Sequence, residues 1–94
     1  MPTIVWTDYL VYRAALRGFD LATLEGIVGY STERYLDTET GRQVVVGRHD
    51  QRTVLIPYEI DKDQITPVTV HAITLQQIRF RLRTGRFRYA QDAG

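Results

Sequence analysis

The sequence predicts a single small α+β domain in which helices flank a four-stranded antiparallel meander. Two observations predict this class. Apolar residues recur at helical spacing from residue 8 to about 29, and the spacing shortens to that of β-strands over residues 33–73. A helical pattern then returns at residue 74. With 94 residues, the chain has the length of one domain rather than two.

The N-terminal part reads as a short strand followed by two helices. Residues 3–6 form a β-type run, and Thr7 stands where a helix N-cap would stand, with Asp8 in the first turn. This helix continues to about residue 16 and stops at Gly18. Asp20 is a second N-cap candidate, and the helix after it ends near Gly29. Its apolar stripe consists of Leu21, Leu24, Ile27 and Val28.

Four strands are predicted next, over residues 33–37, 42–48, 53–60 and 65–73. Gly41 lies in the first turn, Asp50 and Gln51 are central in the second, and Lys62 and Asp63 are central in the third. These turns imply the pairs Val44 with Pro57, Val46 with Leu55, Tyr58 with Pro67, Ile60 with Ile65, and Val54 with His71.

This register assigns side chains to the two faces of the sheet. One face is a core face that carries Val44, Val46, Leu55, Pro57, Val68 and Val70. The other face carries Gln43, Val45, Gly47, Ile56, Tyr58, Thr69 and His71. It is apolar at its centre, and polar groups converge on it. The unbroken Val44–Val46 run indicates apolar neighbours on both faces.

The last helix is predicted to begin with a capping box of Thr74 and Gln77 and to end at Gly85. Its buried stripe consists of Leu75, Ile78 and Leu82. A basic tail over about residues 84–94 completes the domain, which spans residues 1–94.

Charge is unevenly distributed along the chain, although the net charge is only +1. Residues 1–73 hold seven Lys or Arg against ten Asp or Glu, whereas residues 74–94 hold five Arg against one Asp. Three interpretations of this run stay open: a solvated face tied to the acidic body, a surface for an acidic protein partner, and a nucleic-acid contact. The residues of the last interpretation are Arg81, Arg86, Arg88, Phe87 and Tyr89.

Composition excludes several classes of protein. Hydrophobic residues make up 44% and charged residues 24%, as in an ordinary soluble domain, and no apolar run approaches the roughly 18 residues of a membrane helix. The first residues lack the pattern of a secretion signal, so we expect a cytoplasmic protein. There is no cysteine, and His49 and His71 lie far apart in sequence, so we expect neither a metal nor another cofactor.

Several strings resemble a known superfamily. "RAALRGFD", "RYLDTETGRQVVVGR", "TVLIPYEI", "ITPVTVHAI" and "HAITLQQIRFRL" are similar, in pattern and order, to RelE/ParE-superfamily proteins of a family that neighbours the BrnT toxins. The resemblance covers roughly residues 8–83. It implies a compact α+β fold whose RelE-like members cleave RNA, whose ParE-like members poison DNA gyrase, and whose BrnT-like members are neutralised by an antitoxin.

RNA cleavage without a metal requires proton transfer and cations that stabilise the phosphorane. His71 can serve as acid or base, and Tyr58, on the same predicted face, has a hydroxyl to offer. Gly47 leaves room for a phosphate, and Arg79 and Arg83 lie one helical turn apart. The candidate catalytic set is therefore His71, Tyr58, Arg79 and Arg83, although a structural role for His71 and a packing role for Tyr58 stay open.

The function that follows is that of a toxin in a toxin–antitoxin pair, acting as a metal-independent ribonuclease on RNA, with an antitoxin protein as partner. The alternative is a non-catalytic regulatory or interaction protein that binds a protein partner through the arginine-rich C-terminal surface. Gyrase poisoning is a third possibility. The residues leave the oligomeric state open, with the start of the chain near Trp6 as a candidate edge for pairing between subunits.

Overall fold

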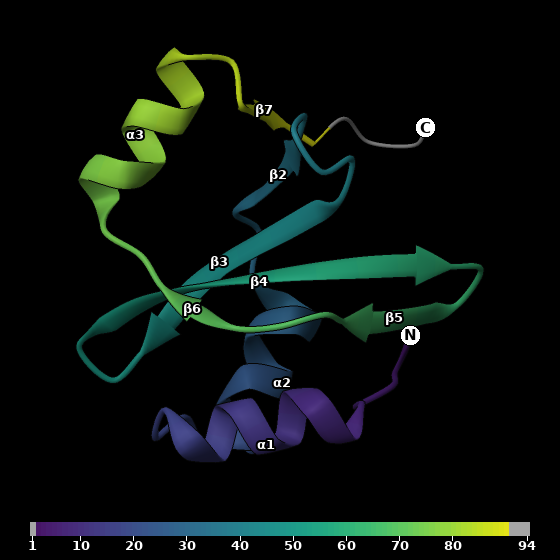
Figure 1. Ribbon diagram of the computed structural model, residues 1–94. Coiled ribbons are helices and arrows are strands. Elements are labelled where there is room, and N and C mark those ends of the chain that lie inside the picture. Colours follow the sequence, from purple (N-terminus) through teal and green to yellow (C-terminus); the bar gives the residue numbers. More distant parts are fainter. Residues whose placement is uncertain (1, 91–94) are drawn as a thin grey trace.

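The computed structural model describes residues 2–90, and these residues form an α+β fold in three layers (Figure 1). Helices α1 (Asp8–Leu16) and α2 (Leu21–Tyr30) cover one face of a mixed sheet, and α3 (Leu75–Arg83) lies over the other. The described strands are β1 (Thr3–Ile4), β2 (Arg34–Asp37), β3 (Gln43–His49), β4 (Arg52–Asp61), β5 (Gln64–Pro67), β6 (His71–Ala72) and β7 (Phe87–Tyr89).

The predicted helices and their caps are confirmed. Thr7 accepts a hydrogen bond from the backbone at the start of α1, and Asp20 does the same for α2. Thr74 and Gln77 form a complete capping box on α3. Each cap satisfies backbone donors that the first turn leaves free, which stabilises a helix by about 1 kcal/mol. No helix within residues 2–90 is long and apolar enough to cross a membrane.

The predicted meander is confirmed for β2 to β5, but the sheet has more strands than the sequence pattern indicated. Its order is β1-β5-β4-β3-β2-β7, with β6 paired to β4. β1 pairs in parallel with β5, so the N-terminal strand finds a partner within the chain. β7 comes from the predicted basic tail and pairs antiparallel with β2. Both additions join segments that are far apart in sequence.

The predicted register holds as far as Pro67 and fails beyond it. Val46 faces Leu55 and Ile60 faces Ile65, as expected. His71, however, pairs with Leu55 and not with Val54. One extra residue lies between β5 and β6, where the chain leaves the ladder beside Pro57 and Pro67, which lack the N–H that a ladder requires.

This bulge moves His71 to the other face of the sheet, because a shift of one residue reverses the direction of every side chain that follows. The predicted common face of Tyr58 and His71 is therefore wrong. Val70 likewise packs against the α1–α2 side and not with Val44 and Val46.

Both faces of the sheet carry a core, as the Val44–Val46 run predicted. The core under α1 and α2 contains Ala14, Phe19, Leu24, Ile27, Val28, Val45, Val54, Ile56, Tyr58, Ile65 and Val70, with Ile4 and Trp6 packed against it. The core under α3 contains Tyr35, Val44, Val46, Leu55, Ile73, Ile78 and Phe87. Leu75, predicted as part of the buried stripe of α3, is instead 56% exposed.

Gly47 provides space for a helix and not, as predicted, for a phosphate. A Cβ at this position would lie 2.6 Å from Cγ2 of Ile27, so the side chain of α2 fills the room that the glycine leaves. We expect Gly47→Ala to lower the free energy of unfolding by about 1–3 kcal/mol, the usual cost of overpacking.

The matched control is Gly26→Ala, because a Cβ there meets nothing within 4 Å. It lies inside α2, where alanine is preferred to glycine by roughly 0.5–1 kcal/mol, so we expect it to stabilise the chain. Urea unfolding of both variants measures the two effects. Equal stability of the Gly47 variant and the wild type would show that α2 can shift without cost.

Candidate functional site

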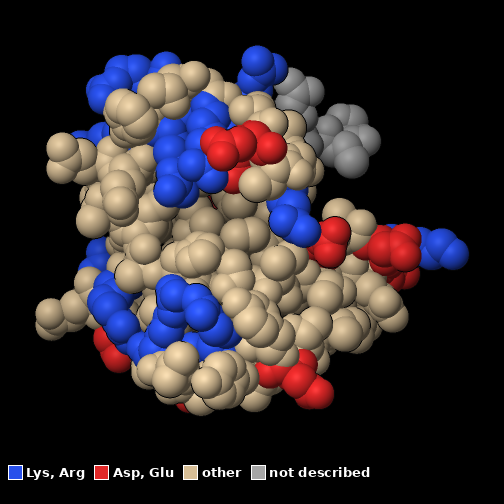
Figure 2. Space-filling view, viewed as in Figure 1, with Lys and Arg blue, Asp and Glu red and all other residues tan. Residues whose placement is uncertain are grey.

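A cavity of about 420 Å³ opens between α3 and the strands beneath it. We call it the α3 groove. The space-filling view shows basic side chains gathered on both sides of this hollowed part of the surface (Figure 2). The groove is lined by Asp37, Thr40, Arg42, Leu55, Pro57, Val68, Thr69, His71, Ala72, Ile73, Gln77, Arg81 and Arg86.

His71 lies on the sheet side of the groove, where the bulge and its pairing with Leu55 place it. Its residue surface is exposed, but the atoms around the imidazole exclude enough water to lower the pKa of His71. The positive charges of Arg17, Arg13 and Arg81 lower it further. The pKa of His71 is therefore below the usual 6.5, and the ring is neutral and able to accept a proton at pH 7.

Two arginines bring positive charge into the groove from different elements. Arg81 reaches it from α3, with its guanidinium carbon 5.3 Å from the ring centroid of Phe87. Arg42 follows the turn between β2 and β3, and its Nε is buried without a hydrogen-bond partner among the described residues. Neither has a carboxylate within 4.0 Å in residues 2–90, so neither forms an ion pair within the described part of the chain.

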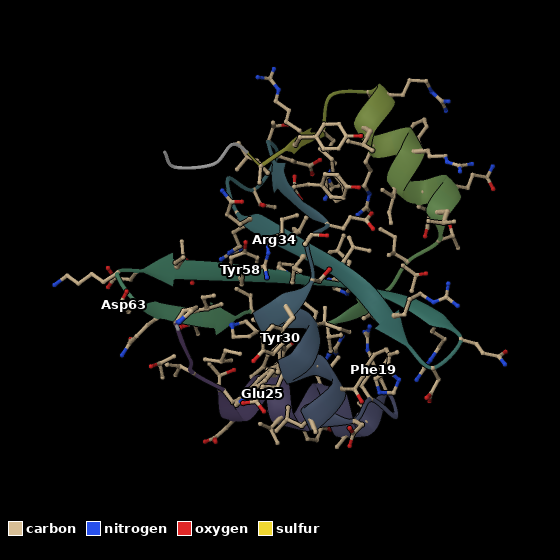
Figure 3. All side chains as sticks on the ribbon, turned by 180° about the vertical axis from the view of Figure 1, so that it is seen from behind. Phe19, Glu25, Tyr30, Arg34, Tyr58 and Asp63 are labelled. Atoms are coloured by element: carbon tan, nitrogen blue, oxygen red, sulfur yellow. The ribbon has the colours of Figure 1, made fainter. Side chains whose placement is uncertain are left out.

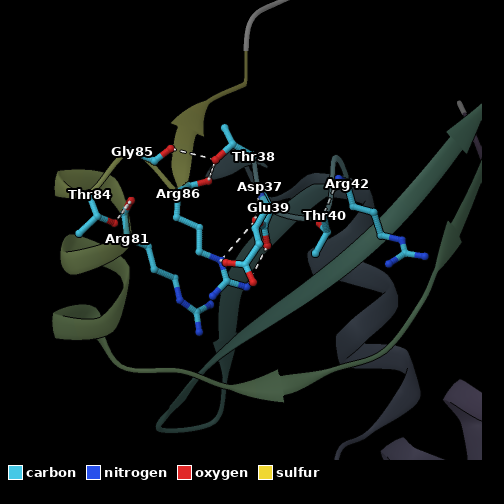
Figure 4. A network of polar contacts seen from close by, with 9 residues as sticks. All are labelled: Asp37, Thr38, Glu39, Thr40, Arg42, Arg81, Thr84, Gly85 and Arg86. Atoms are coloured by element: carbon cyan, nitrogen blue, oxygen red, sulfur yellow. Dashed lines mark hydrogen bonds and ion pairs between the residues drawn. The ribbon is translucent and has the colours of Figure 1, made fainter.

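Arg86 also lines the groove, but its charge is already used (Figure 4). Its Nε and Nη2 each lie 3.3 Å from an oxygen of the buried Asp37, and its Nε lies 3.4 Å from Glu39. Burial alone would raise the pKa of Asp37, but the hydrogen bonds from Arg86 and from backbone N–H groups outweigh it and lower that pKa. One interpretation of the charge pattern was that the C-terminal arginines pair with acidic residues of the domain. Arg86 does so, with Asp37 and Glu39.

The same network holds the end of α3 against β2. The hydroxyl of Thr38 donates toward the carbonyl oxygens of Gly85 and Arg86, at 3.0 Å each, and the Thr38 backbone N–H donates to Arg86 at 2.7 Å (Figure 4). These bonds tie the segment after α3 to the turn after β2.

Of the predicted catalytic set, only His71 lines the groove. Tyr58 is 5% exposed in the opposite core, with the guanidinium of Arg34 5.6 Å from its ring centroid (Figure 3). Arg79 and Arg83 lie on the flank of α3 turned away from the groove, because a helix turns by 100° per residue and Gln77 and Arg81 occupy the groove side. The structure therefore does not bring the four side chains together.

The predicted nucleic-acid-binding residues also separate. Arg81 lines the groove, whereas Phe87 is 1% exposed and belongs to the core under α3. Arg88 and Tyr89 are exposed on the edge strand β7. Residues 91–94 of the predicted tail lie outside the described residues.

Sequence reasoning missed the groove residues Arg42 and Gln77 and the neighbouring Arg17. The Nη1 of Arg17 donates to the carbonyl oxygen of Val70, the residue before His71, at 3.3 Å. The signal for Arg17 was its place four residues after Arg13 on one side of a helix. No local signal indicated Arg42, because its position depends on the fold of the β2–β3 turn against α3.

The second histidine has a structural role. His49 is buried, and its Nε2 accepts a hydrogen bond of 2.7 Å from the backbone N–H of Asp20 at the start of α2. Within residues 2–90, no three His, Asp or Glu side chains come together in a way that could hold a metal ion.

The fold and the groove define a small α+β domain with a surface groove that His71 and three arginines help to line. Comparison with protein-family models, with curated proteins and with solved structures finds no match for the chain. The resemblance to the RelE/ParE superfamily therefore stays a prediction from the sequence strings.

Proposed function

We propose that the chain binds RNA in the α3 groove and cleaves it without a metal, as the toxin of a toxin–antitoxin pair. One observation carries the proposal: a neutral His71 shares the groove with Arg42 and Arg81, neither of which has a carboxylate within 4.0 Å in residues 2–90. A proton acceptor in the same groove as two guanidinium groups that form no ion pair fits attack on a phosphodiester. The resemblance to RelE-like proteins supports RNA as the target.

The groove residues divide the reaction between them. His71 takes the proton of a ribose 2′-hydroxyl, and the 2′-oxygen attacks the adjacent phosphorus. Arg42 and Arg81 stabilise the charge that builds up on the non-bridging oxygens. As the new O2′–P bond forms, the P–O5′ bond breaks on the opposite side of the phosphorus, and the departing 5′-oxygen takes a proton from water while protonated His71 later returns its proton to solvent. The products are a 2′,3′-cyclic phosphate and a 5′-hydroxyl.

Binding tests the first half of the proposal. We expect Arg81→Ala to weaken RNA binding about tenfold and to reduce by roughly one the slope of log affinity against log salt, because one phosphate contact is lost. Arg79→Ala is the matched control, since it removes the same charge from the other flank of the same helix. Fluorescence anisotropy over a salt series measures both. Equal losses in the two variants would show that only diffuse charge is involved, and no binding by the wild type would refute the proposal.

A second candidate function has an observation of its own. Phe80 is 56% exposed on α3 and, with Arg83, helps to line another cavity, of about 450 Å³. Apolar and basic side chains together suit an acidic protein segment that folds on contact. The second candidate function is therefore that of a non-catalytic interaction protein, which binds its partner through this side of α3. Co-purification with the product of a neighbouring reading frame, without RNA cleavage by the free chain, would favour it.

A further inference from the structure

Helix α1 leaves an aromatic flank exposed. It buries only Leu10 and Ala14, whereas Tyr9 is 57% exposed and Tyr12 is 63% exposed. At 100° per residue, Arg17 and Arg13 lie beside the buried stripe, and Tyr9 and Tyr12 follow them around the helix. Around α1, the two arginines therefore lie next to the buried side of the helix, and the two tyrosines lie further toward solvent. We call the side chains of Arg17, Arg13, Tyr9 and Tyr12 the α1 flank.

The α1 flank begins where the α3 groove ends. Arg17 is hydrogen-bonded to the carbonyl oxygen of Val70, next to His71, and the charges of both Arg17 and Arg13 act on the His71 ring. A group of basic side chains on the α1 side of the hollow is visible in Figure 2. Within residues 2–90, neither Arg13 nor Arg17 has a carboxylate within 4.0 Å.

Arginine and tyrosine are combined on this flank in a way that suits an unpaired base. The guanidinium carbon of Arg13 lies 5.7 Å from the ring centroid of Tyr9, and the Nε of Arg13 is buried without a hydrogen-bond partner among the described residues. Guanidinium and aromatic planes bind bases by stacking, which requires bases that are free of a duplex. The flank therefore suits a single strand, because its arginines can contact phosphates and its tyrosines can stack on unpaired bases.

We propose that the α1 flank is a second subsite, which binds the single strand that leaves the α3 groove, with its phosphates on Arg17 and Arg13 and a base stacked on Tyr9. This inference rests on the proposed function, because it places the first part of the same RNA in the groove. It goes further by specifying single-stranded RNA and an additional contact beyond His71.

The test uses the whole chain and 2′-O-methyl RNA, which binds but cannot be cut. The strands have lengths of about four and about twelve nucleotides, within the range that single-strand sites span. We expect the wild type to bind the longer strand about tenfold more tightly. Tyr9→Ala should weaken binding of the longer strand by at least about fivefold, as loss of one stacked base does, and leave the shorter strand unchanged. Tyr9→Phe should retain the ring and the affinity.

Tyr30→Ala is the matched control, because Tyr30 is 72% exposed on α2 and is seen in the rear view of Figure 3. Equal affinity of the wild type for the two lengths, an unchanged Tyr9→Ala variant, equal loss in Tyr30→Ala, or duplex binding as tight as single-strand binding would each overturn the inference. In those cases the shorter strand still binds and the proposed function stands. If the wild type binds neither length, both proposals fail.

Discussion

Replacement of His71 by glutamine is expected to lower the rate of RNA cleavage by about 10²–10⁴-fold, the usual contribution of general base catalysis. Glutamine is polar and of similar size but cannot take a proton, and because His71 is exposed the substitution should leave the fold intact. RNA binding should change little, because the charges of Arg42 and Arg81 remain. Single-turnover cleavage, with growth arrest on tightly controlled expression, measures the effect.

Tyr58→Phe is the informative control for this experiment. The sequence placed Tyr58 beside His71, but the structure places it in the opposite core, so its hydroxyl cannot reach RNA in the α3 groove. This variant should retain cleavage. If the His71 variant cuts RNA at the wild-type rate, His71 is not the base. If neither the wild type nor the His71→Gln variant arrests growth, the chain has another role.

The pH profile separates a proton acceptor from a merely structural histidine. Cleavage requires neutral His71, so the rate should rise with pH and level off below the usual histidine pKa of 6.5, because desolvation and three arginines lower the pKa of this ring. Arg17→Gln removes one of these charges and should move the rise in cleavage rate to higher pH.

The same shift makes stability depend on pH. Because the pKa of His71 is lower in the folded than in the unfolded chain, the free energy of unfolding decreases as pH falls below about 6.5.

Replacement of Phe87 by alanine is expected to lower the free energy of unfolding by about 3–5 kcal/mol, as for other buried phenylalanines. Its ring stacks on the ring of Tyr35 at a centroid distance of 5.5 Å. The guanidinium carbon of Arg81 lies 5.3 Å from the centroid of the Phe87 ring. Its 1% exposure leaves no surface for a nucleic-acid base. A loss of this size is a large part of the stability of a small domain, typically about 5–15 kcal/mol.

Urea unfolding of Phe87→Ala and of Phe80→Ala gives the comparison. Phe80 is 56% exposed in the same arginine-rich segment, so its replacement should change stability by less than about 0.5 kcal/mol. A Phe87 variant of native stability that lost only RNA affinity would restore the interpretation of Phe87 as a stacking residue. The expected instability also means that activity tests of variants in β7 need a measure of folded protein.

The arginine run does not form one surface. Arg81 enters the groove and Arg86 is bound by Asp37, whereas Arg79 and Arg83 lie on the other flank of α3. The reason is geometric. Arg79, Arg81 and Arg83 are two residues apart, and residues at this spacing share one face of a strand but point to different sides of a helix. The charge pattern therefore predicted a basic surface near the C-terminus without indicating which arginines would share it.

The sequence by itself determined the helices with their caps at Thr7, Asp20 and Thr74, and the register of the meander as far as Pro67. These features follow from hydrogen bonds and periodicities within a few residues, which the chain carries locally. His71 could be selected as a candidate because its chemistry needs no knowledge of the fold.

Only the tertiary structure decided what surrounds His71. A single extra residue in the bulge after Pro67 puts the His71 side chain on the opposite face of the sheet from the predicted one. Nothing in the alternating sequence pattern marks the position of this bulge. The packing of Ile27 over Gly47 and the approach of Arg17 and Arg42 to the groove likewise depend on contacts between distant segments. Such contacts form only when the chain is folded, so the site became visible in the structure and not in the order of the residues.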